Sequence, residues 1–231
     1  MHTRKLLTTL TAIALAGGTL AGCGGSSTNG VESKSPTEII SAAQKAAEGA
    51  KSVKVAGSVS SAGTALTLNL QIAHGQGAKG TISEGPLSFE LIRVGSSVYI
   101  KGSAAFYEHF AGSEAAKLLQ GKWLQAPATS GEFAQLGNLT NMSQLLSTVL
   151  GQHGSLTKTA TSTVEGKKVV GVKDTSKGGV LYVATTGKPY PVQISKTGST
   201  GGKVTFEDWN AALTITAPSG AINIEKLKSA G

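Results

Sequence analysis

The sequence predicts an α+β domain with a large antiparallel sheet of about ten strands. Three observations lead to this class: a capped helix comes first, two blocks of short segments follow in which apolar and polar residues alternate, and a helical stretch separates the blocks. Residues 35–231 have the length of one domain. The only cysteine, Cys23, has no partner for an internal disulfide, so the apolar core must stabilise the fold.

The first 22 residues have the pattern of a secretory signal peptide. Arg4 and Lys5 provide the positive end, and an apolar stretch too short to span a bilayer comfortably follows at 6–19. The sequence Leu-Ala-Gly-Cys at 20–23 resembles the bacterial lipobox, which implies that Cys23 carries covalent diacylglycerol and N-acyl lipid and becomes the new N-terminus. The alternative is an ordinary secretory signal with a chance cysteine near its end, or a buried cysteine that packs as a small apolar residue.

Residues 23–34 are predicted to form a flexible linker. They are Gly- and Ser-rich at the start and polar to Lys34, and they have no apolar periodicity. Two or three acyl chains on Cys23 would hold the domain at the membrane almost permanently. The expected location is therefore the extracytoplasmic face of the cell membrane.

The first helix of the domain is predicted to begin after Ser35. Pro36 suits the first helical position, and Glu38 lies three residues after the capping serine, as in a capping box. The apolar residues that follow at helical spacing are Ile39, Ala43, Ala46, Ala47 and Ala50.

The strands are predicted where the apolar period changes to two. Glycine-rich turns join successive segments, which is typical of an antiparallel meander. The first block contains segments 53–60, 66–72, 78–83, 88–94 and 98–101, and the second contains 155–164, 167–174, 180–184, 190–195, 203–206 and 213–216. A last turn of helix is expected at 223–228.

The stretch between the two blocks is predicted to be helical. Phe106 and Phe110 lie four residues apart, and Gly112 separates them from a second short helix that ends near Leu118. The clearest helical stripe of the chain follows, with apolar residues at the i, i+3, i+4, i+7 and i+8 positions of one face. Its members are Met142, Leu145, Leu146, Val149 and Leu150.

Five segments resemble those of the actinobacterial envelope lipoproteins of the LppX and LprG type, whose fold is similar to that of the lipoprotein carriers LolA and LolB. These segments are 98–102, 121–123, 181–183, 189–192 and 206–209. The resemblance implies a curved half-barrel sheet with helices over its concave face and a lipid cavity between the two layers. The candidate cavity residues are Val98, Ile100, Phe106, Phe110, Leu118, Met142, Leu145, Leu146, Val149 and Leu150. Alternatively, the same residues pack as a solid core that leaves no space for a ligand.

Charge and motif content argue against nucleic-acid binding and catalysis. Loss of Arg4 and Lys5 lowers the basic residues from 21 to 19, against 13 acidic ones, which leaves a net charge of +6 on singly scattered side chains. Nucleic-acid binding requires clustered basic residues, so that class is excluded. His74, His109 and His153 are far apart and have no ligand-spaced partner, so neither an enzyme, a metal site nor any cofactor besides the lipid on Cys23 is predicted.

Two functions are consistent with this sequence. The first is a membrane-anchored lipoprotein that binds, carries or presents a lipid or glycolipid in a hydrophobic cavity. The second is a non-enzymatic interaction module of the envelope, in which the core is filled and an outer surface docks onto another envelope protein.

Overall fold

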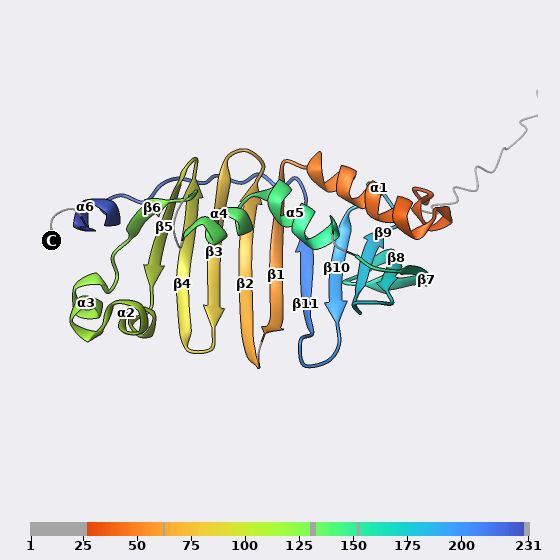
Figure 1. Cartoon of the computed structure of the whole chain (residues 1–231). Coiled ribbons are helices and arrows are strands. Elements are labelled where there is room, and N and C mark those ends of the chain that lie inside the picture. The colour runs from red at the N-terminus through yellow and green to blue at the C-terminus, as the bar shows by residue number, and fades with distance from the viewer. Residues whose placement is uncertain (1–26, 62, 130–132, 152, 229–231) are drawn as a thin grey trace, which may run out of the picture.

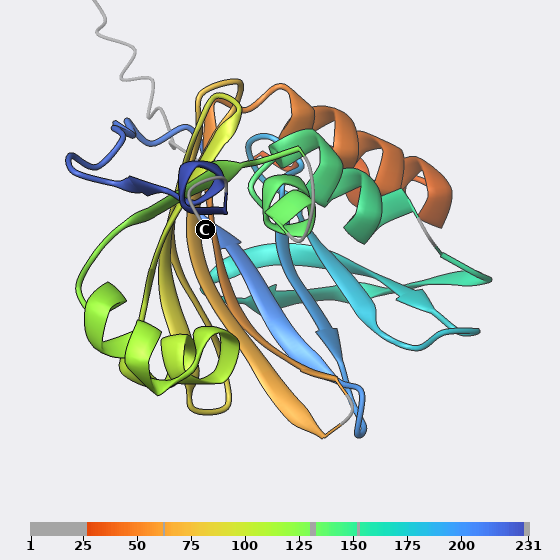
Figure 2. The same ribbon diagram turned by 60° about the vertical axis from the view of Figure 1, so that its left-hand side comes forward.

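The computed structural model describes residues 27–61, 63–129, 133–151 and 153–228. Within them, one curved sheet carries helices on its concave side (Figures 1 and 2). The first strands along the chain are β1 (Ser52–Ser61), β2 (Thr64–Ala73), β3 (Gly77–Glu84), β4 (Leu87–Val94), β5 (Ser97–Gly102) and β6 (Leu124–Pro127). The later strands are β7 (Leu156–Val164), β8 (Lys167–Asp174), β9 (Val180–Ala184), β10 (Pro191–Lys196), β11 (Gly202–Glu207) and β12 (Ile222–Asn223).

The strand order is β12-β6-β5-β4-β3-β2-β1-β11-β10-β9-β8-β7. Each block is a meander of sequential neighbours, as the tight glycine turns predict, and pairing of β1 with β11 joins the two blocks. Every pair of named strands is antiparallel except β12 with β6. The predicted α+β class with a large antiparallel sheet is confirmed.

Glycines inside strands help the sheet to curve. Gly57 in β1 and Gly80 in β3 have φ values of +152° and +155°, which residues with a Cβ rarely adopt. A Cβ at Gly57 would collide with the backbone of Lys203 on the neighbouring strand. These positions therefore allow a bend in the strands that other residues would oppose.

The helices are α1 (Pro36–Glu48), α2 (Ala104–Ala111), α3 (Ser113–Leu119), α4 (Ala134–Leu139), α5 (Met142–Gly151) and α6 (Ile224–Lys228). In Figure 1, α1, α4 and α5 lie across one end of the strands, whereas α2 and α3 lie at the other end, beside β4 and β5. No helix among the described residues is long and apolar enough to cross a bilayer.

The capping box predicted for α1 is present. The Ser35 side chain accepts a hydrogen bond from the backbone N–H of Glu38, and the Ser35 N–H donates to Glu38 Oε2 at 2.9 Å. The Ser35 hydroxyl also donates to Glu38 Oε2 at 2.6 Å, and the two hydrogen bonds that the carboxylate accepts, from this hydroxyl and from the Ser35 N–H, lower the pKa of Glu38. The helix buries Ile39, Ala43 and Ala47 completely against the sheet and α5.

The N-terminal segment differs from the predicted linker. Thr28 forms an isolated bridge with Thr186, and the Asn29 side chain donates to the carbonyl of Ala184 at 3.0 Å. Val31, in a short 3-10 helix (η1, Val31–Ser33), is only 1% exposed. The prediction that the linker continues to Lys34 is therefore wrong, because one buried valine and a side-chain amide attach this segment to the domain. The predicted signal peptide and Cys23 lie outside the described residues and stay predictions.

The C-terminal region also differs from the prediction. Segment 213–216 is not a strand, although Leu213 and Ile215 are partly buried and Thr214 is exposed, as its alternation predicts. The segment lies on the sheet without joining a ladder, and Lys79 Nζ donates to the Thr214 carbonyl at 3.1 Å. The predicted last turn of helix is confirmed as α6. The short elements β6, β12 and α4 were not predicted.

Candidate functional site

The concave face of the sheet is apolar along most of its width. Residues paired across antiparallel strands share a face, so the register gives the side chains that point toward the helices. One row of directly paired, inward-facing residues consists of Phe89, Ile82, Leu68, Gly57, Val204, Ile194 and Leu181. The row above it consists of Ile100, Leu91, Gly80, Leu70, Val55 and Phe206.

The upper part of this face is filled. Leu91 is 0% exposed, Leu70 and Phe206 are 1% exposed, and all three belong to one core cluster with residues of α1 and α5. Five predicted cavity residues lie in the same cluster and are buried: Val98, Ile100, Met142, Leu146 and Leu150. These five side chains lie close together, as the predicted cavity requires. They pack against one another and against the sheet, however, as in the alternative of a solid core.

Lower on the same face, apolar side chains are only partly buried. We call these five residues, which pack against the core yet reach solvent, the open strip: Leu66, Leu68, Phe89, Ile194 and Val204. In Figures 1 and 2, no helix of the described chain crosses the lower halves of β1, β2, β10 and β11. The sequence did not predict the open strip, because apolar and polar residues alternate in the same way in the covered and the uncovered halves of β2 and β11.

Aromatic rings extend the open strip to the molecular surface. The Phe106 ring centroid lies 5.2 Å from that of Phe89 and 4.8 Å from that of Phe110, so the three rings form a continuous series from β4 to α2. Gly102 makes room for this packing, since a Cβ there would collide with the Phe106 ring. Phe110 is 66% exposed, and Leu118 on α3 is 68% exposed.

A buried tyrosine fixes α2 against the sheet. Tyr107 is 1% exposed, and its hydroxyl accepts from the Gly102 N–H at 3.0 Å and donates to the Lys122 carbonyl at 3.1 Å. Burial raises the pKa of Tyr107. Both polar functions of the hydroxyl are satisfied, so Tyr107 positions Phe106 and Phe110 and is not itself available to a ligand.

Two further predicted cavity residues belong to α5. Leu145 is partly buried and packs against the core from α5. Val149 belongs to α5, but its side chain lies outside the part of the chain that the structure describes. The structure therefore brings the predicted residues into two groups: a packed core under α5, and an exposed apolar edge at α2 and α3.

Two of the solved structures that resemble this chain have TM-scores above 0.5. The LprF protein of Mycobacterium bovis superposes with a TM-score of 0.55 at 17% identity, over 80% of this chain and 97% of that chain. The lipoprotein LppX of Mycobacterium tuberculosis superposes with a TM-score of 0.52 at 16% identity, over 78% of this chain and 98% of that one. This chain has the LppX-type fold. Neither a family model nor a curated protein sequence matches it.

The predicted resemblance is thus confirmed for the LppX-type fold, and within that fold the open strip is an apolar part of the concave face whose side chains are only partly buried. No group of three or more potential metal ligands occurs among the described residues. His74, His109 and His153 are all exposed: His74 lies in the turn between β2 and β3, His109 in α2 and His153 in the loop before β7. The open strip is therefore suited to apolar contacts with a ligand.

Proposed function

We propose that this protein is a lipoprotein, anchored through Cys23 at the extracytoplasmic face of the cell membrane, that binds the acyl chains of a lipid or glycolipid on the open strip. The observation that carries the proposal is the uncovered apolar part of the concave face, continued by Phe106 and Phe110 to the surface. The LppX-type fold supports it.

The driving force is removal of apolar surface from water. Each methylene that leaves water contributes about 0.8 kcal/mol, and the strip presents side chains that are already held in place by the core below them. An acyl chain lying across Leu68 and Val204 would also shield these side chains. The ligand would therefore lie along the face of the sheet, since Met142, Leu146 and Leu150 of α5 are buried in the core.

The position of Thr28 limits how far the domain can move from the membrane. Five peptide units separate Cys23 from Thr28, and a fully extended chain of that length spans at most about 18 Å. Because Thr28 is bonded to the domain at Thr186, a lipidated Cys23 would keep the domain close to its own bilayer. The cargo would then be taken from that membrane or passed to a partner nearby.

A docking module is the second candidate. The packed core beneath α5 and the exposed side chains of Phe110 and Leu118 are what that function predicts. The partner would be another protein of the envelope that covers α2 and α3.

The two candidates are distinguished by lipid binding in a variant without the anchor. The full chain carrying Cys23→Ser is purified from its own host, analysed by native mass spectrometry and titrated with a fluorescent fatty acid. We expect a co-purified lipid and saturable uptake of the probe. A Phe110→Gln/Leu118→Gln double variant should bind the probe about tenfold more weakly, since it removes two apolar contacts of about 1 kcal/mol each or less.

The matched control is Glu108→Gln, an exposed position on the same helix as Phe110. It should bind the probe like the parent. Absence of both lipid and probe binding in the parent would refute the carrier function and leave the docking module.

A further inference from the structure

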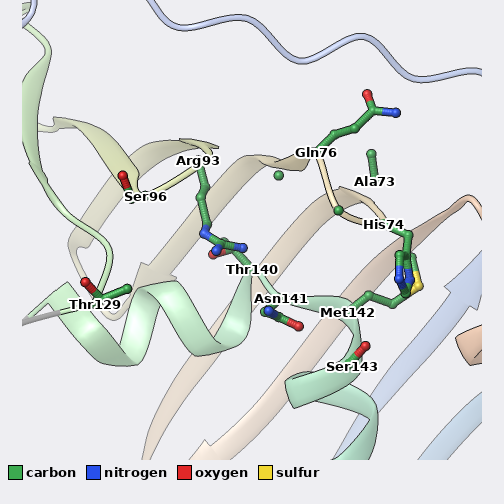
Figure 3. Close-up of a pocket in the computed structure, with 13 residues that line it drawn as sticks. Ala73, His74, Gln76, Arg93, Ser96, Thr129, Thr140, Asn141, Met142 and Ser143 are labelled. Carbon is green, nitrogen blue, oxygen red and sulfur yellow. The ribbon is translucent and has the colours of Figure 1, made fainter.

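A cavity of about 420 Å³ opens at the end of the sheet nearest α4 and α5. Its walls are the β2–β3 turn, the β4–β5 turn and the junction between α4 and α5 (Figure 3). The polar side chains used below are those of His74, Arg93, Thr140, Asn141 and Ser143. No acidic residue is among the lining residues that the structure describes.

Arg93 is the cation of this cavity. It is the only arginine after the predicted signal peptide, and it lies on the inward face of β4, paired with Ala78 and Val98, both 0% exposed. Its Nε is buried and has no hydrogen-bond partner. None of the described carboxylates forms an ion pair with it. A buried, unpaired guanidinium donor is unfavourable unless a ligand supplies the acceptor.

The α4–α5 junction presents donors to the same space. Asn141 Oδ1 accepts from the Gln144 N–H at 3.2 Å, which leaves the side-chain NH₂ of Asn141 as a donor. The first backbone amides of α5, a helix of ten residues, have no acceptor within the helix. The Leu136 carbonyl of α4 already accepts a hydrogen bond from Thr140 Oγ1 at 2.7 Å, so it does not compete with a ligand for these donors.

Figure 3 shows Arg93 reaching from β4 toward Thr140 and Asn141, while His74 lies on the opposite wall. The guanidinium fork, an amide, a hydroxyl and helix N–H groups together match the oxygens of a phosphate, which accepts several charge-assisted hydrogen bonds. We propose that this cavity binds a phosphate group, held by Arg93 with Asn141 and Ser143.

The phosphate site does not rest on the acyl-binding function. On the inward face of β4, the fully buried Leu91 lies between Arg93 and Phe89, so the cavity and the open strip are separate. The phosphate is either free in solution or part of a lipid headgroup at the membrane surface. The two sources share the same recognition chemistry, and the experiment below distinguishes them.

The test uses the full chain carrying Cys23→Ser and two probes. The first is inorganic phosphate, titrated at constant ionic strength and followed by the thermal midpoint and by ³¹P NMR line width. The second is a set of vesicles made of phosphatidylcholine alone or with 30% phosphatidylglycerol. We expect saturable phosphate binding that weakens at least tenfold in Arg93→Gln and about threefold in Arg93→Lys, which keeps the charge but loses the fork.

Lys167→Gln is the matched control, because it removes one positive charge from an exposed position of β8. It should bind phosphate like the parent. Arg93→Gln should unfold at the same temperature as the parent without phosphate, since Nε gives up no hydrogen bond, so lost binding would not reflect lost folding.

Each outcome decides the proposal. Phosphate binding that depends on Arg93, with vesicle binding independent of it, assigns the site to a free phosphate. Dependence of the phosphatidylglycerol vesicles on Arg93 assigns it to a headgroup. No saturable binding of either probe by the parent, or equal binding by parent and Arg93→Gln, overturns the phosphate site and leaves the acyl-binding function untouched.

Discussion

Two halves of one strand differ in their surroundings. On the inward face of β2, Leu70 and Ile72 are at most 1% exposed, whereas Leu66 and Leu68, the two preceding positions of the same alternation, are only partly buried. The residues and their spacing are alike, and the difference is that α1 and α5 cover only the end with Leu70 and Ile72 (Figure 1). The apolar face of the sheet is therefore longer than the helical layer that covers it.

This difference separates stability from binding. Side chains under α5 contribute to the free energy of unfolding through close packing, since interiors tolerate few voids. Side chains of the open strip contribute less to folding and remain available to a ligand. Substitutions in the covered half should therefore mainly lower stability, and substitutions in the open strip should mainly weaken acyl binding.

The largest loss of stability is expected under α5. Leu146→Ala removes a side chain that is 1% exposed and should lower the free energy of unfolding by about 3 kcal/mol, because it leaves a cavity between helix and sheet. Urea unfolding measures this. Gln144→Ala, at an exposed position of the same helix, should change stability by less than about 0.5 kcal/mol. A loss below 1 kcal/mol for Leu146→Ala would show that the covered half is not closely packed.

Val31, in the segment before α1, belongs to the closely packed core of the covered half. Val31→Ala should cost about 2 kcal/mol, since Val31 is buried in the same core cluster as Leu146. Lys34→Ala, three residues further on and exposed, is the control for urea unfolding. If Val31→Ala is as stable as Lys34→Ala, the segment before α1 does not stabilise the domain and acts as a linker.

In the open strip, a substitution should weaken ligand binding more than it lowers stability. Leu68→Ala is expected to cost only about 1 kcal/mol in urea unfolding, because the side chain is partly exposed, yet to weaken binding of a fluorescent fatty acid severalfold. Asn69→Ala, whose side chain points to the other face of β2, should leave binding unchanged. If Leu68→Ala binds the probe like the parent, the strip is not the acyl site.

The smallest effect is expected away from both halves, in the turn after β8. The Asp174 carboxylate accepts from the backbone N–H groups of Lys177 at 2.8 Å, Gly154 at 2.8 Å and Ser176 at 2.9 Å, and these bonds lower its pKa. Its contribution is therefore present above the unfolded pKa of about 3.9 and is lost as the pH falls through the lower folded pKa. Asp174→Asn should flatten the dependence of the thermal midpoint on pH below about 5, and an unchanged slope would contradict this.

Local sequence signals predicted much of the fold. The capping box at Ser35, the glycine turns between strands and the stripe from Met142 to Leu150 each depend on neighbours along the chain, and the corresponding elements are present. Segment 213–216 shows the limit of such signals. Its alternation reflects a chain with one side against the sheet, but strand formation also requires an unpaired edge, which depends on distant residues.

The candidate site was less predictable for the same reason. The sequence placed Met142, Leu146 and Val98 together but could not say whether they enclose a space, because that depends on how closely α5 approaches the sheet. The open strip has no sequence signal of its own, since Leu68 and Leu70 differ only in what covers them. Val31 and Asn29 were missed because a single buried valine has no periodicity.

The most direct test of the open strip is photo-crosslinking with a palmitate that carries a diazirine in its acyl chain. The probe is loaded onto the full chain with Cys23→Ser, irradiated, and the modified residues are mapped by peptide mass spectrometry. Binding on the concave face predicts labels at Leu66, Leu68, Val204 and Phe110. Labels confined to the outer face of the sheet, at Asn69 and Gln71, or no specific label at all, would contradict it.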